Sequence, residues 1–78
     1  MDQLILNRMK TQSNTLKKKI DEEQEFIKAM VNYHTMATDR GIKNYLLSVI
    51  KADVEKHNNM VSLHNKIELI LIQINLSL

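Results

Sequence analysis

Apolar residues recur at alternating steps of three and four along two stretches of the chain, and we call each set of positions a seam. The first seam consists of Leu6, Met9, Ser13, Leu16, Ile20, Glu23, Ile27, Met30, His34 and Ala37. The second seam consists of Leu46, Ile50, Asp53, His57, Met60, His64, Ile67, Leu71, Ile74 and Leu78. This heptad spacing is typical of coiled coils and predicts two long helices, each with one face against another helix.

The phase of the pattern changes between the two stretches. If the first seam continued, its next positions would be poor core residues: Gly41, Asn44, Ser48 and Lys51. We therefore expect a tight turn at about 39–41, with Gly41 in a left-handed conformation and Asp39 as a capping residue. The predicted helices cover about 3–38 and about 42–77, and Asp2 is the expected N-cap of the first.

The two predicted helices have similar lengths, and their seams match when the chain folds back on itself. Leu6 then lies opposite Ile74, and Glu23 lies opposite His57. The composition agrees with an all-α fold, because proline is absent, glycine appears once and aromatic residues make up only 4% of the chain. The 78 residues therefore predict a single domain, an antiparallel helical hairpin of two long helices.

Further apolar residues flank the second seam, and a single partner helix cannot cover so broad a stripe. They are Leu47, Val54 and Val61 on one side and Val49, Leu63 and Ile70 on the other. We therefore expect a homo-oligomer, in which two hairpins pair into a four-helix bundle or a larger helical assembly forms. The corresponding function is that of a non-enzymatic, self-associating structural or protein-interaction module.

The charge pattern does not favour nucleic acid as a partner. The net charge is only +2, and the basic residues Arg8, Lys10 and 17–19 are followed directly by the acidic run 21–23. Aromatic residues that could stack on bases are not interleaved with them, and the acidic run would repel phosphate.

The C-terminal apolar run does not predict a membrane span. It has about half the roughly 20 residues that a spanning helix needs, and it contains Gln73 and Asn75. No signal peptide is visible and the chain has no cysteine, so we expect no disulfide and a cytoplasmic location.

Three polar residues in the middle of the seams are candidates for chemistry. Glu23 faces His57 across the hairpin, and Asp53 stands one turn before His57 on the same helix face. Helical bundles use carboxylates and imidazoles from neighbouring helices to hold divalent iron, manganese or zinc, and His64 is a further candidate ligand. Alternatively, these side chains satisfy one another and fix the register of the helices, in which case no cofactor is expected. No catalytic residue is indicated.

The residues around this layer carry a resemblance to a known family. Residues 29–37 (AMVNYHTMA) are followed on the second helix by Leu46, Ile50, Asp53 and His57. This arrangement resembles the ligand-bearing helix pair of ferritin-like and rubrerythrin-like proteins, which implies half of a bundle that must dimerise. Where that family has its ligand glutamates, this sequence has Phe26 and Val54. The resemblance therefore implies His57 as a matching ligand, but not ferroxidase activity.

Overall fold

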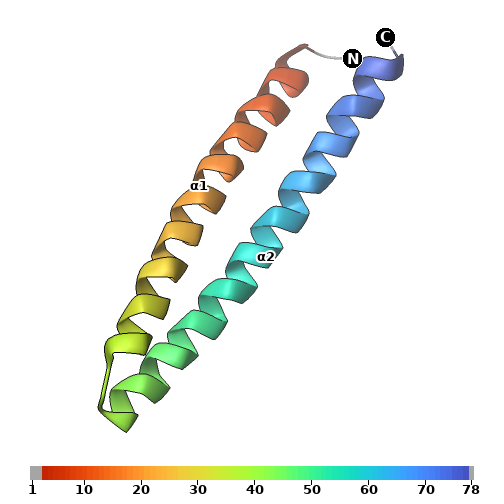
Figure 1. Ribbon diagram of the computed structural model, residues 1–78. Coiled ribbons are helices and arrows are strands. Elements are labelled where there is room, and N and C mark those ends of the chain that lie inside the picture. The colour runs from red at the N-terminus through yellow and green to blue at the C-terminus, as the bar shows by residue number, and fades with distance from the viewer. Residues whose placement is uncertain (1–2, 78) are drawn as a thin grey trace.

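The computed structural model describes residues 3–77, which form two helices and the short connection between them (Figure 1). Helix α1 spans Gln3–Met36 and helix α2 spans Arg40–Ser77. The two helices run antiparallel in a rod of 58 × 14 × 14 Å, and the start of α1 lies at the same end as the end of α2. The prediction of an all-α helical hairpin is confirmed.

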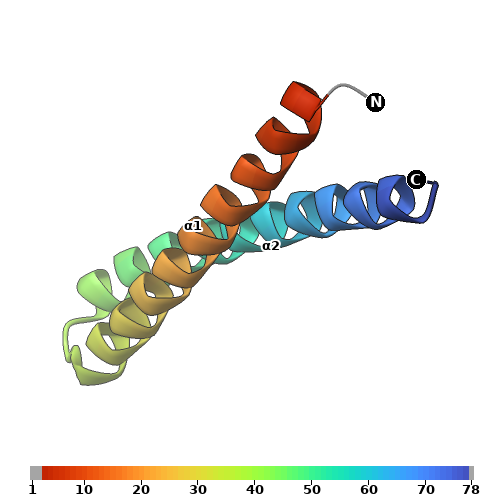
Figure 2. The same cartoon turned by 90° about the horizontal axis from the view of Figure 1, so that it is seen from above.

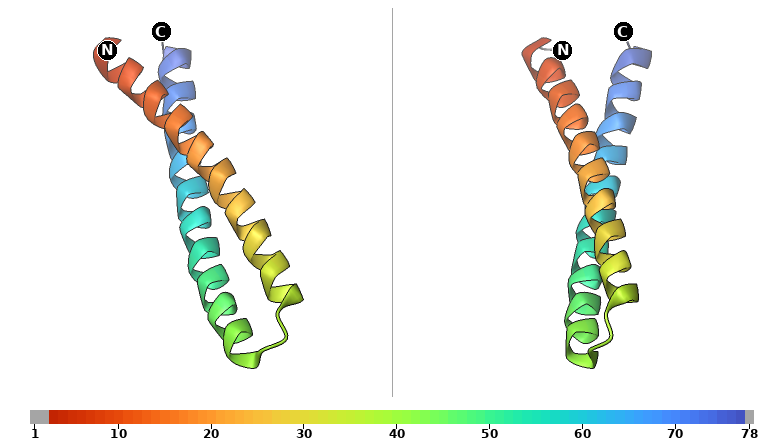
Figure 3. Two further views of the ribbon diagram at one scale, coloured as in Figure 1. Left: turned by 90° about the vertical axis from the view of Figure 1, so that its left-hand side faces the viewer. Right: turned by 60° about the vertical axis from the view of Figure 1, so that its left-hand side comes forward.

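The helices are inclined to each other but stay in contact towards the free end, where Leu6 and Leu71 are the buried hydrophobic side chains among residues 3–77. Views from above and from the side show this inclination (Figures 2 and 3). A single slanted crossing is the usual result when side-chain ridges of one helix pack into grooves of the other. Much of each helix is consequently covered on one narrow strip only.

The seams predicted from the heptad spacing form this strip. Every residue of the first seam is buried or half-buried, and so is every residue of the second seam from Leu46 to Ile74. Leu78, the last position of the second seam, lies outside the described residues. The spacing of apolar positions thus predicted correctly which side chains lie between the helices.

The connection lies earlier than expected, at residues 37–39 rather than about 39–41. Asp39 caps α2, because its Oδ2 accepts a hydrogen bond from the Ile42 backbone N–H at 3.0 Å. The Asp39 carbonyl also accepts a hydrogen bond from the Lys43 N–H at 3.0 Å. The predicted capping role of Asp39 is therefore confirmed, and the cap places the start of α2 at Arg40.

The prediction that Gly41 takes a left-handed conformation is wrong. No glycine has a positive φ in the part of the chain that the structure describes, and Gly41 lies in the first turn of α2. An added Cβ at Gly41 would lie 3.2 Å from Asp39 Oδ2. The glycine thus leaves room for the capping carboxylate and does not reverse the chain. Asp2, the expected N-cap of α1, lies outside the described residues.

The core between the helices is thin. Among residues 3–77, the buried hydrophobic side chains are Leu6 and Leu71, each 8% exposed. The accessible surface is 6101 Å², whereas a compact monomer of this mass is expected to have about 4,900 Å². The hairpin therefore exposes about 1,200 Å² more than a compact fold of the same size would. Neither helix contains an apolar window long enough to cross a membrane, within the residues described.

Candidate functional site

The three candidate residues lie in the interface between the helices, as predicted. Glu23 stands on α1, Asp53 and His57 stand on successive turns of α2, and all three are half-buried. Glu23 Oε1, Asp53 Oδ2 and His57 Nε2 are each shielded from solvent and have no hydrogen-bond partner. An unsatisfied buried polar group costs about 1–3 kcal/mol. We call these three residues the Glu23 layer. It is a half-buried polar layer in which one atom of each residue lacks a hydrogen-bond partner.

One ion pair connects the layer to the surface. Lys56 Nζ lies 3.8 Å from Glu23 Oε2, and the Lys56 side chain is 65% exposed while that of Glu23 is 14% exposed. An exposed lysine at this distance contributes little, because water screens the charge and the flexible chain must be ordered. The pair leaves the second oxygen of Glu23 without a partner.

The single hairpin does not bring the layer together as a set of metal ligands. Within residues 3–77, no three histidine, aspartate or glutamate side chains converge in a way that could hold a metal ion. The layer is not self-satisfied either, because one polar atom of each member lacks a hydrogen bond. Metal binding by these residues and their role as a structural polar layer therefore both stay predictions, and in one hairpin the layer has three atoms that could accept a further partner.

A second polar cluster, which the sequence did not predict, lies closer to the free end of the hairpin. Ser13, only 3% exposed, donates a hydrogen bond to Glu68 Oε1. His64 Nε2 lies 3.2 Å from Ser13 Oγ and 3.6 Å from Glu68 Oε1. His64, a further candidate ligand in the sequence interpretation, is thus occupied by this Ser13 cluster. Two features of the sequence could have indicated this cluster. Ser13 is a small polar residue in the first seam, and Glu68 is a carboxylate one turn after the seam residue His64.

The Ser13 cluster has the residue types of a hydrolytic site but not its geometry. A nucleophilic serine must give its proton to a base such as histidine, whereas the Ser13 hydroxyl donates to Glu68. Ser13 is also almost fully enclosed between the helices. The cluster therefore joins the two helices and fixes their register.

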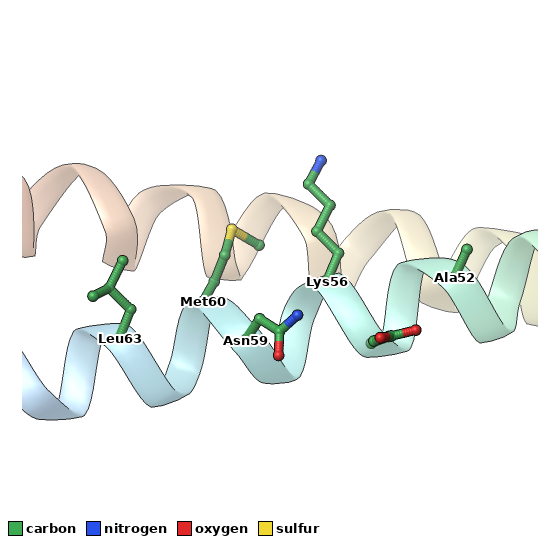
Figure 4. Close-up of a pocket in the computed structure, with 6 residues that line it drawn as sticks. Ala52, Lys56, Asn59, Met60 and Leu63 are labelled. Atoms are coloured by element: carbon green, nitrogen blue, oxygen red, sulfur yellow. The ribbon is translucent and has the colours of Figure 1, made fainter.

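Shallow grooves adjoin one another along one side of the hairpin. One groove is lined by Lys19, Glu22, Glu23 and Lys56, and a neighbouring groove contains both Lys19 and Leu63. In a third, Leu63, Met60 and Lys56 rise from α2 alongside α1 (Figure 4). Because the three grooves share lining residues, they form one continuous depression that includes an edge of the Glu23 layer.

Comparison with family models, with curated proteins and with solved structures finds no match to this chain. The resemblance to ferritin-like proteins thus stays a prediction.

Proposed function

We propose that this chain is a non-enzymatic helical hairpin that self-associates, two copies forming a four-helix bundle that acts as a structural or protein-interaction module. The observation that carries the proposal is the large apolar surface left uncovered by the single hairpin. Exposed large apolar residues on α2 include Leu47, Val54, Leu63 and Ile70. Stripes of this width are typical of helices with more than one helical neighbour.

The amount of excess surface agrees with a dimer. A standard interface buries about 800 Å² on each partner, and obligate dimers bury 2,000 Å² or more in total. The excess of about 1,200 Å² over a compact monomer is therefore what one extensive interface would remove. With two buried leucines as the buried hydrophobic residues within 3–77, a single hairpin also has a smaller core than most stable domains of its size.

Sedimentation equilibrium at micromolar concentration tests the proposal, with helix content followed by circular dichroism. We expect a species of twice 9.1 kDa and a melting temperature that rises with protein concentration, because association stabilises the folded state by mass action. A well-folded monomer whose melting temperature does not depend on concentration would exclude self-association as the function.

A second candidate function is the binding of a divalent metal by Glu23, Asp53 and His57. The three unpartnered buried atoms support it, because two carboxylates and an imidazole are a ligand set that suits iron, manganese or zinc. A second hairpin would supply a second such set, and the combined groups could reach the ligand number that one chain lacks.

Metal analysis of protein purified without chelator tests this candidate. The variant His57→Ala removes the proposed ligand, and His34→Ala is a matched control because His34 is also a half-buried seam histidine. We expect the wild type and His34→Ala to retain metal and to gain thermal stability when zinc or manganese is added, and His57→Ala to do neither. Equal, near-zero metal in all three proteins would eliminate the candidate.

A further inference from the structure

One side of the hairpin is lined by two rows of residues at heptad spacing. On α1 the row consists of Ile5, Gln12, Lys19, Phe26 and Tyr33, and on α2 it consists of Ile42, Val49, Lys56, Leu63 and Ile70. The grooves show that the two rows adjoin each other, since Lys19 shares one groove with Leu63 and another with Lys56. We call this side the lysine-centred face.

The lysine-centred face is apolar towards both ends of the rod. At the turn, Phe26, Tyr33 and Ile42 are exposed, and at the free end Ile5 and Ile70 are exposed. Large exposed apolar side chains towards both ends of one face are typical of an interface and are unusual on a monomer surface.

The centre of this face carries both charges. The middle groove is lined by Lys19 and Lys56 together with Glu22 and Glu23, and Glu55 lines the groove beside it. A cluster with cations and anions side by side can pair with a copy of itself. Neither a purely acidic nor a purely basic partner would match it as well, because either would face at least two like charges.

The opposite flank of the hairpin is less suited to a second copy. There α2 presents the apolar residues Leu47, Val54 and Val61, but the corresponding heptad row of α1 contains Gln3, Lys10, Lys17 and Gln24 before Val31. The α2 row continues to Glu68, but Ser13 and His64 already contact that carboxylate. Two copies joined through this flank would therefore bring lysines of the same sign together.

We infer that a second copy of this chain docks on the lysine-centred face through a two-fold axis, so that the central charged clusters of both copies meet. This inference rests on the proposed self-association and adds which surface is used. In a two-fold interface the same patch serves both partners. Whether the second rod runs parallel or antiparallel to the first, apolar ends meet apolar ends and the centre meets the centre.

Substitutions on the two flanks of α2 test the choice of face. Leu63→Glu changes the lysine-centred face, and Val54→Glu is the matched control on the opposite flank of the same helix; both side chains are exposed, at 50% and 39%. We expect Leu63→Glu to weaken dimerisation at least about thirty-fold, as for a central interface residue, and Val54→Glu to change it less than about threefold. Circular dichroism verifies that both variants stay helical.

Cysteine cross-linking provides a measurement that does not depend on weakening the dimer. The chain contains no cysteine, so Lys56→Cys introduces a single thiol at the centre of the face. We expect a bismaleimide cross-linker to join two copies through this thiol in either orientation of the second rod, because position 56 lies at the centre of the interface, whereas the exposed control Lys51→Cys is not cross-linked.

The outcomes separate the inference from the proposal beneath it. The proposed face is wrong, although self-association stands, if the wild type dimerises and the dimer is dissociated by Val54→Glu but not by Leu63→Glu. In that case Lys56→Cys should also fail to cross-link. If the wild type is a folded monomer, the proposed function fails and the inference fails with it.

Discussion

Ser13 offers the sharpest test of how the two helices are aligned. It is the most enclosed polar residue described, at 3% exposure, and it contacts His64 and Glu68 on the opposite helix. Replacing it with alanine removes a hydrogen bond to a charged group, which costs about 1.5–3 kcal/mol when buried. Because Glu68 is partly exposed and can turn to water, we expect a loss at the low end, about 1–1.5 kcal/mol.

Ser13→Leu should be more damaging, although it makes the seam more regular. The larger side chain has no space at a position that is already enclosed, and overpacking costs about 1–3 kcal/mol in addition to the lost hydrogen bond. For a chain of this size each kcal/mol lowers the melting temperature by about 4–8 °C. We therefore expect Ser13→Leu to melt at least about 10 °C below the wild type, measured by circular dichroism at one fixed protein concentration.

The control is Ser62→Leu, because Ser62 is an exposed serine on α2 and not part of a seam. It should shift the melting temperature by no more than about 3 °C, as for most surface substitutions. If Ser13→Leu instead stabilised the protein, position 13 would have room for a leucine, and the register that places Ser13 beside His64 and Glu68 would be incorrect.

Two further predictions concern the core and the cap of α2. Leu71→Ala should lower the free energy of unfolding in urea by about 2–3 kcal/mol, because Leu71 is 8% exposed, whereas Leu76→Ala at 83% exposure should change it by less than about 0.5 kcal/mol. Asp39→Ala should cost about 1 kcal/mol by removing the cap. Gly41→Ala should stabilise the Asp39→Ala variant by up to about 1 kcal/mol through helix propensity. It should stabilise the native protein by less, since the new Cβ would crowd Asp39 Oδ2. A double-mutant cycle of thermal melts measures the difference. Equal effects of Gly41→Ala in both backgrounds would contradict the crowding.

Heptad spacing was enough to predict the fold and the contents of the interface. Glu23 lies beside Lys56, the residue before His57 and so within one position of the match that the seams predicted, because a helix returns a residue to the same face every seventh position. The connection lies about two residues earlier than predicted, since the Asp39 side chain caps α2 and lets this helix begin at Arg40.

The sequence could not predict which polar seam residues would be satisfied. Ser13 and Asp53 are both seam residues between the helices, but only Ser13 is hydrogen-bonded to the opposite helix. The difference depends on whether a complementary side chain lies within about 3 Å, and residue spacing does not resolve distances on that scale.

The contrast between the two polar layers leads to a final prediction, for Glu23→Leu. The Ser13 cluster already joins the helices, so the Glu23 layer is not needed for register and leaves three buried atoms without partners. In a single hairpin, replacing Glu23 with leucine removes one such atom and should stabilise the fold by about 2 kcal/mol. Glu23 also lines the groove at the centre of the lysine-centred face, and a second copy would bring its own lysine ammonium groups there.

Those donors should pair with Glu23 in the dimer, so the benefit of Glu23→Leu should shrink. The test is the same substitution in two backgrounds: the monomeric Leu63→Glu variant and the wild-type dimer, each unfolded in urea in the presence of chelator. We expect the gain in stability to be at least about 1 kcal/mol larger in the monomer, because an unpaired buried carboxylate costs more than a paired one. Equal gains in both backgrounds would mean that the second copy leaves the Glu23 layer as it is. A loss of stability only when zinc or manganese is added would instead identify a metal ion as the missing partner.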